Sequence, residues 1–181
     1  MGLPRYHIEG HIYYVTTVVY GRLPIFTRPS FIIPLLDSLN FYRYQRSFKL
    51  LGYVIMPDHV HLLLWPFGQP TVSDIMRDYK KFTSRRIIQQ AEVEHADEWV
   101  VAFQQAGQET GRSVNKVWQD DYWDTNIYTE RFLRQKLNYV HRNPVRAGLA
   151  EKLEDYPYSS YRNYVLGEEW LIEIDRGWMS E

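Results

Sequence analysis

Hydrophobic and polar residues alternate along the chain with periods that predict strands and helices in a definite order. Residues 11–19 read His-Ile-Tyr-Tyr-Val-Thr-Thr-Val-Val, a β-branched and aromatic run that predicts a strand. After Pro29, apolar residues recur at helical spacing for about four turns. Two further apolar runs, residues 49–56 and 59–65, are separated by a Pro-Asp pair, so they predict an antiparallel hairpin with a short turn.

The second half of the chain passes again from helix to strand to helix. A helix capped by Thr71 or Ser73 is expected to end near residue 90, and residues 117–128 are consistent with a fourth strand. Residues 91–115 hold an acidic cluster followed by a Gly-, Gln- and Ser-rich stretch. We expect an irregular or mobile insertion there, or a helix tail followed by a loop.

The resulting order is β-α-β-β-α-β-α. Its first six elements match a ferredoxin-like α+β sandwich, in which helices cover one face of an antiparallel sheet of four to five strands. The last helix is an addition to that unit. A chain of 181 residues without an internal repeat suits one domain, which we assign to residues 1–181.

Composition narrows the classes of function. Hydrophobic residues make up 45% of the chain, so a packed core is expected, and the net charge of −1 is unlike that of a general DNA-coating protein. The chain has no cysteine, which excludes disulfides, thiolate zinc sites and cysteine nucleophiles. Neither an apolar run of membrane-spanning length nor a signal-peptide core is present in the sequence, so we predict a cytoplasmic protein.

A pair of histidines on the predicted hairpin offers the first candidate chemistry. His59 and His61 are two residues apart on a strand, so both imidazoles point to one face while Val60 points to the other. Two such imidazoles can hold one divalent ion, provided that a third ligand comes from elsewhere. The alternative is that they are ordinary hydrogen-bonded histidines of a half-buried strand.

A tyrosine and an asparagine share one face of the last helix, which opens at Thr129. Tyr139 and Asn143 are four residues apart, so their side chains project together, and Asn143 would supply a third ligand if this face lies over the histidines. Pro144 predicts a kink or a helix end at that point, and Gly148 is a stop signal. The alternative is a core tyrosine and a plain helix-end residue.

Two segments together resemble the REP-associated tyrosine transposases, which belong with the single-tyrosine HUH transposases. These segments are Gly-Tyr-Val-Ile-Met-Pro-Asp-His-Val-His at residues 52–61 and Asn-Tyr-Val-His-Arg-Asn-Pro-Val-Arg at residues 138–146. The resemblance implies that His59, His61 and Asn143 bind Mg²⁺ or Mn²⁺ and that Tyr139 is the nucleophile. It also implies cleavage and transfer of single-stranded DNA through a 5′-phosphotyrosine, at repeats that fold as hairpins.

Basic residues on two helices are candidates for contact with DNA. Three of them on the second helix are spaced by four and form a stripe, which is equally consistent with a solvated outer face. Others lie along the tyrosine helix and could steer a strand toward Tyr139. The candidates are Arg77, Lys80, Lys81, Arg85, Arg131, Arg134, Arg142 and Arg146.

Three points stay open at this level. A descendant that binds hairpin DNA without cutting it is the main alternative function, and a small zinc hydrolase that uses the histidine pair is a weaker one. Asp58 and His141 are the only candidates for a general base. The tyrosine could act within its own subunit or across a homodimer, so the protein could be a monomer or a dimer. Association with the nucleoid is expected only because DNA is the proposed target.

Overall fold

A computed structural model describes residues 10–45, 48–111, 113–167 and 170–178, and the structural statements below concern these residues. Four strands form one sheet in the order β2-β3-β1-β4, and every neighbouring pair is antiparallel. The strands are β1 (Ile12–Val18), β2 (Phe48–Met56), β3 (His59–Pro66) and β4 (Trp123–Ile127). This topology confirms the ferredoxin-like α+β fold, although the fourth strand is shorter than residues 117–128.

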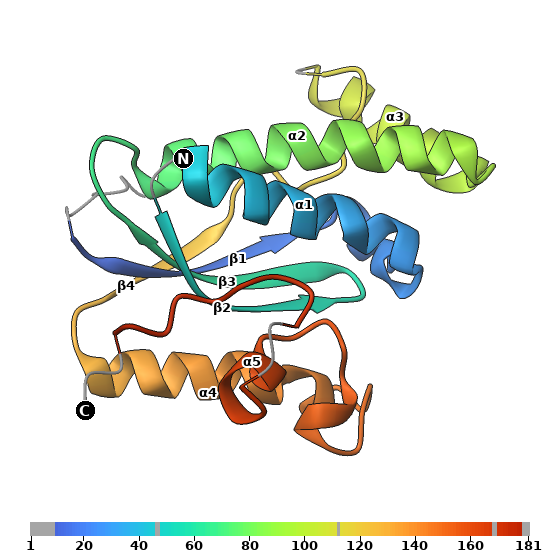
Figure 1. The fold of residues 1–181 in the computed structure, drawn as a ribbon. Coiled ribbons are helices and arrows are strands. Elements are labelled where there is room, and N and C mark those ends of the chain that lie inside the picture. Colours follow the sequence, from blue (N-terminus) through green and yellow to red (C-terminus); the bar gives the residue numbers. More distant parts are fainter. Residues whose placement is uncertain (1–9, 46–47, 112, 168–169, 179–181) are drawn as a thin grey trace.

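Helices cover both faces of the sheet rather than one (Figure 1). α1 (Pro29–Gln45) and α2 (Val72–Val93) pack on each other over one face, while α4 (Glu130–Arg146) and α5 (Tyr161–Val165) lie across the other face. Three short 3-10 helices, η1 (Tyr20–Arg22), η2 (Ile25–Thr27) and η3 (Leu153–Asp155), lie in the connections. No helix of the described chain is long and apolar enough to span a membrane.

Alternation along β3 divides the core into two layers. Val60, Leu62 and Leu64 belong to the larger cluster beneath α1 and α2, whereas Leu63 belongs to a second cluster beneath α4. Because successive side chains of a strand point to opposite faces, His59 and His61 share the α4 face with Leu63. The predicted facing of the two histidines is therefore confirmed, and α4 lies on their side of the sheet.

The predicted irregular insertion at residues 91–115 is wrong, because most of this segment is helical. α2 continues to Val93, and α3 (Asp97–Thr110) follows after a tight turn. Trp99 and Phe103 lie one helical turn apart and face the core, where the Trp99 ring packs edge-on against Phe31 with centroids 5.1 Å apart. The polar composition of this segment did not indicate a helix, because α3 is stabilised by only a few buried aromatic and small residues.

The tyrosine helix begins where the sequence predicts and ends slightly later. The Thr129 hydroxyl caps α4 by accepting a hydrogen bond from Phe132 N. The helix runs through Pro144 to Arg146, so the helix end expected at the proline is wrong by two residues. Gly148 then adopts a φ of +71°, a conformation in which glycine is favoured, and the helix stops as predicted.

A single glycine allows this helix to approach the sheet closely. Gly52 lies at an irregularity in the pairing of β2 with β3. A Cβ atom at this position would stand 2.7 Å from Leu137 Cδ1 of α4, closer than van der Waals contact permits. The absence of a side chain at Gly52 therefore allows α4 to lie close to the sheet at Leu137, which precedes Tyr139 by two residues.

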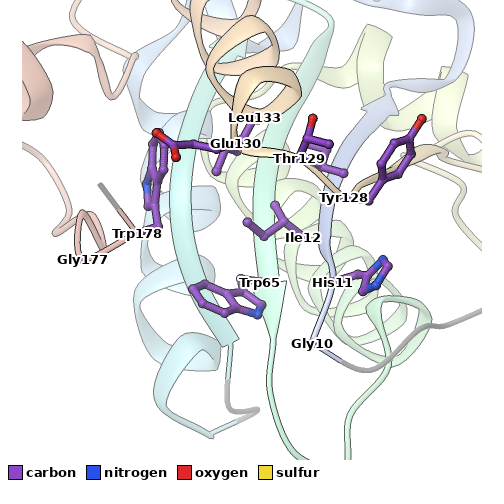
Figure 2. Close-up of a pocket in the computed structure, with 11 residues that line it drawn as sticks. Gly10, His11, Ile12, Trp65, Tyr128, Thr129, Glu130, Leu133, Gly177 and Trp178 are labelled. Atoms are coloured by element: carbon purple, nitrogen blue, oxygen red, sulfur yellow. The ribbon is translucent and has the colours of Figure 1, made fainter. Parts of the chain in front are cut away.

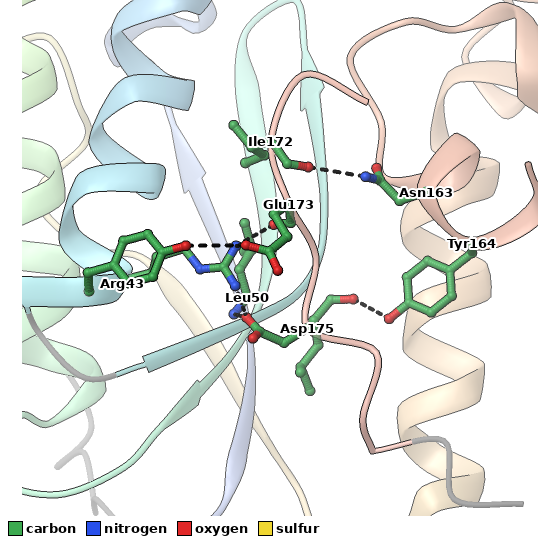
Figure 3. A network of polar contacts seen from close by, with 9 residues as sticks. Arg43, Leu50, Asn163, Tyr164, Ile172, Glu173 and Asp175 are labelled. Carbon is green, nitrogen blue, oxygen red and sulfur yellow. Dashed lines mark hydrogen bonds and ion pairs between the residues drawn. The ribbon is translucent and has the colours of Figure 1, made fainter. Parts of the chain in front are cut away.

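The C-terminal segment closes the β2 edge of the sheet (Figure 3). Leu50 and Asp175 exchange two hydrogen bonds, from Leu50 N to the Asp175 carboxylate and from Asp175 N to Leu50 O, each 2.9 Å long. Arg43 of α1 donates to the same carboxylate at 2.6 Å, and the Tyr164 hydroxyl donates to Leu51 O. These contacts fix the segment along β2 and leave β4 as the opposite edge of the sheet.

Candidate active site

His61 is held by hydroxyl groups from the neighbouring strand. Thr16 lies directly opposite His61 in the β1–β3 pairing, and its Oγ1 is 2.7 Å from His61 Nδ1, while the Tyr14 hydroxyl is 2.8 Å from the same nitrogen. With the proton on Nδ1, the lone pair of Nε2 is free, and Nε2 is buried without a hydrogen-bond partner in the described structure. A buried nitrogen of this kind is costly unless a ligand satisfies it.

Burial keeps His61 neutral. Desolvation is the largest cause of a pKa of about 3 for His61; repulsion from the nearby His59 and Lys136 contributes to the decrease, and Asp58 opposes it. A metal ligand must be the neutral imidazole, so this environment keeps His61 in the binding form at any physiological pH.

His59 is oriented by a carboxylate. Asp58 Oδ1 lies 2.5 Å from His59 Nδ1, and Asp58 Oδ2 accepts a hydrogen bond from Arg22 at 3.1 Å. Burial of the Asp58 carboxyl opposes ionisation, but the bonds from His59 and then Arg22 outweigh it and lower its pKa. An ionised carboxylate on Nδ1 fixes the imidazole and directs Nε2 outward, as in many metal sites. Asp58 therefore positions His59, which leaves it a poor candidate for a general base.

Tyr139 lies beside the histidines in the same chain. Its ring centroid is 5.8 Å from that of His61 and 6.1 Å from that of Tyr14, and the His59 and His61 centroids are 4.8 Å apart. The Tyr139 side chain is 38% exposed, so DNA could reach its hydroxyl. The structure thus brings together, within one chain, the tyrosine and the histidine pair that the sequence singled out.

Asn143 is placed one turn beyond Tyr139, but part of its amide is engaged. Asn143 Nδ2 donates to Tyr139 O at 3.0 Å, which makes Oδ1 the atom that could bind a metal ion. Among the described residues, no group of three or more His, Cys, Asp or Glu could hold a metal. The role of Asn143 as a third ligand stays a prediction, as do the metal roles of His59 and His61.

Two cations of the tyrosine helix lie over aromatic rings of this site, and the sequence identified only one of them. The Arg146 guanidinium is 5.8 Å from the centre of the Tyr139 ring, and Lys136 Nζ is 4.5 Å from the centre of the Tyr14 ring. Lys136 precedes Tyr139 by three residues, so helical spacing alone could have revealed it. Tyr14 and Thr16 were also missed, because their contact with His61 depends on a strand register that the sequence does not display.

The basic stripe of α2 is not brought to this site. α2 covers the opposite face of the sheet, and Arg77 pairs there with Asp74 and Asp78. Lys80 donates to two backbone carbonyl groups, Gln119 O and Asp120 O. DNA contact by the remaining candidates on the two helices, Lys81, Arg85, Arg131, Arg134 and Arg142, stays a prediction.

The contacts of His141 join two parts of the fold and do not involve Tyr139. His141 is buried, its Nε2 is 3.0 Å from Ser160 Oγ, and its ring contacts Tyr161 and Tyr164. Burial lowers its pKa to about 4. These contacts tie α4 to α5 and point away from Tyr139, so His141 is not placed to act as its base.

A cavity of about 380 Å³ lies at the other end of α4, near the first turn of that helix. Figure 2 shows Trp65, Tyr128 and Trp178 arranged around Ile12 in its walls. Its described lining residues include neither the histidine pair nor Tyr139. The candidate reacting groups therefore lie outside this cavity.

Comparison with known proteins agrees with this arrangement. A sequence model of the family described as "Transposase IS200 like" matches residues 7–143. A REP-associated tyrosine transposase of Escherichia coli is 23% identical over 164 residues, which cover 89% of this chain and 82% of that protein. A Haemophilus influenzae protein named for the same class is 26% identical over 168 residues, covering 88% and 85% of the two chains.

A solved structure shares the fold. It is that of a REP-associated tyrosine transposase bound to a REP hairpin, and it superimposes with a TM-score of 0.68 at 20% sequence identity. The match covers 92% of this chain and 86% of the other.

Proposed function

This chain belongs to the IS200-like transposase family, and we propose that it cuts and rejoins single-stranded DNA through a covalent bond between Tyr139 and a 5′ phosphate. The observation that carries this proposal is the packing of the Tyr139 ring 5.8 Å from His61 within one chain. A partly exposed nucleophile then lies beside a pair of potential metal ligands on one face of the sheet, so a phosphodiester that reaches Tyr139 also lies close to the histidines.

The reaction would proceed by displacement at phosphorus. The Tyr139 oxygen forms a bond to phosphorus as the bond from phosphorus to the 3′ oxygen breaks. The phenol proton passes to water, and the leaving 3′ oxygen takes a proton from water. The products are a 5′-phosphotyrosine and a free 3′ hydroxyl. Because the tyrosyl phosphodiester retains the reactivity of the original bond, a second 3′ hydroxyl can displace Tyr139 and join two strands without ATP.

The surroundings of the histidines fit a divalent ion. His61 Nε2 is buried without a partner, and the contacts of Asp58 and of the two hydroxyls occupy the Nδ1 atoms of both rings. His59 and His61 would hold the ion together with Asn143 Oδ1. When bound, Mg²⁺ or Mn²⁺ would withdraw negative charge from the scissile phosphate and favour attack.

Cations from the chain would assist in binding the phosphate backbone. Lys136 lies over the Tyr14 ring and Arg146 over the Tyr139 ring, where they would attract phosphates and hold the strand near the tyrosine hydroxyl. The structural relative carries a REP hairpin, and hairpin-forming repeat DNA is the target that we propose for this chain. Binding should therefore weaken steeply as salt is raised.

Covalent capture tests the proposal. End-labelled hairpin DNA with single-stranded flanks would be incubated with the protein and Mn²⁺ and then run on a denaturing gel. We expect a protein–DNA adduct that migrates more slowly than the free DNA. The Tyr139→Phe variant should not form this adduct, although it should still bind the DNA. Tyr128→Phe is the matched control, because Tyr128 is an exposed tyrosine whose ring lies 6.1 Å from that of Phe132 on the same helix as Tyr139. Binding without an adduct by the unaltered protein would instead support the non-cleaving alternative.

A further inference from the structure

An exposed tryptophan lies in line with the histidine site. In the sheet, Trp123 of β4 pairs with Thr16 of β1, and Thr16 pairs with His61 of β3, so the three residues form one row across three strands. Directly opposed residues of antiparallel strands point to the same face. Trp123 therefore points to the α4 face, and its Cα is about 10 Å from that of His61 at the usual strand spacing.

The buried end of β4 confirms this facing. Ile127 lies four residues after Trp123 on the same strand, and it belongs to the core cluster beneath α4. Residues an even number apart on a strand share a face. Both lines of evidence place the Trp123 ring on the α4 face of the sheet, the face on which Tyr139 lies.

The exposure of this ring is unusual for its residue type. The side chain is 78% exposed, the joint highest value among the large hydrophobic residues of the described chain. Tryptophan is mostly buried in folded proteins, because exposing the indole forfeits a large hydrophobic gain. Exposed aromatic rings beside a path for the phosphate backbone are the groups on which unpaired bases stack.

We propose that Trp123 stacks on an unpaired nucleobase next to the phosphate that Tyr139 attacks. This inference rests on the proposed function. Aromatic rings bind single-stranded DNA by stacking on bases, and a nucleotide that flanks the reacting phosphate can span the distance from His61 to Trp123.

Charge favours a base over a phosphate as the group that Trp123 contacts. Asp121 precedes Trp123 by two residues, whereas the cations Lys136 and Arg146 of α4 lie over the rings of Tyr14 and Tyr139. The backbone phosphates would therefore follow the cations of α4, while the neutral face of a base meets the indole.

A second protein is a less suitable occupant of this surface. The strand reads Trp-Asp-Thr-Asn-Ile, with only its last residue buried in the core. A stable protein interface buries about 800 Å² on each partner, with a largely apolar centre. One indole flanked by polar side chains does not provide such a centre.

Binding measurements with three variants test the inference. Trp123→Ala, Trp123→Phe and the control Phe41→Ala would be titrated with fluorescently labelled single-stranded DNA of mixed sequence and with abasic DNA of equal length. Phe41 is an exposed aromatic residue of α1, on the other face of the sheet. We expect Trp123→Ala to bind the mixed DNA about five- to one-hundred-fold more weakly, with Trp123→Phe close to the unaltered protein and Phe41→Ala unchanged. On abasic DNA the difference should disappear.

Three results would overturn the inference: equal binding by Trp123→Ala, a defect that persists on abasic DNA, or a change of oligomeric state in light scattering. The last result would mean that the ring packs against a second copy. The covalent-capture gel separates this inference from the proposed function. An adduct from the unaltered protein combined with normal binding by Trp123→Ala would contradict only the role of Trp123, whereas base-dependent binding through Trp123 without any adduct would contradict only the cleavage.

Discussion

Replacement of Gly52 by alanine tests whether close packing of α4 on the sheet is required. The added Cβ would meet Leu137 Cδ1 at 2.7 Å, Leu63 Cδ1 at 3.3 Å and Ser160 Oγ at 3.4 Å. Leu137 is itself buried, so its methyl group has little room to move. Overpacking of this kind costs about 1–3 kcal/mol, and we expect the free energy of unfolding to fall by that amount.

If the packing around Gly52 can accommodate a Cβ atom, Gly52→Ala should raise the free energy of unfolding instead of lowering it. Gly52 does not have a positive φ, so alanine fits the backbone, and the loss of unfolded-state freedom alone would stabilise the protein by about 0.4–1 kcal/mol. Urea unfolding of Gly52→Ala, Leu137→Ala and the double variant would separate the two effects. If contact with Leu137 dominates, Gly52→Ala should cost about 1–3 kcal/mol less in the Leu137→Ala background. A neutral or stabilising Gly52→Ala in the unaltered background would refute the packing argument.

Three further predictions concern the site and its support. Asp58→Asn should weaken Mn²⁺ binding about 10- to 100-fold in calorimetric titration, because His59 loses its orienting carboxylate, and an unchanged affinity would contradict that role. His141 has a folded-state pKa of about 4, below its unfolded value, so its contribution to stability is lost as pH falls from about 6.5 toward 4. Denaturant unfolding at pH 7 and pH 5 should show a decrease about 2 kcal/mol smaller for His141→Gln than for the unaltered protein, and equal decreases would exclude His141 as the source. A mixture of Tyr139→Phe with His61→Ala should form no DNA adduct, because one chain supplies both groups, whereas restored adduct would show action across a dimer.

Local patterns in the sequence were sufficient to predict which candidate site residues share a face of one strand or one helix. The two-residue period of β3 placed His59 and His61 on one face, and the four-residue spacing on α4 placed Asn143 one turn from Tyr139. These predictions hold because each depends on a single element whose geometry is fixed by backbone hydrogen bonds.

Features that depend on contact between distant segments could not be predicted in this way. Thr16 reaches His61 only through the β1–β3 register, and Gly52 meets Leu137 only when α4 lies on the sheet. α3 was missed for a related reason, since its few core residues are interspersed with glutamine and glutamate and gain stability only by packing on α2 and against Phe31 of α1. Lys136 did not require such knowledge, because its position three residues before Tyr139 on one helix is evident from the sequence.

The central claim is that the Tyr139 hydroxyl forms the bond to DNA, and peptide mapping of the adduct tests it most directly. Trypsin cuts after Lys136 and after Arg142, so Tyr139 is the only tyrosine of the peptide 137–142. We predict that mass spectrometry of the nuclease-trimmed adduct finds a nucleotide phosphate on Tyr139 within this peptide. A phosphate found on Tyr14 or on any other residue, with peptide 137–142 unmodified, would contradict the account.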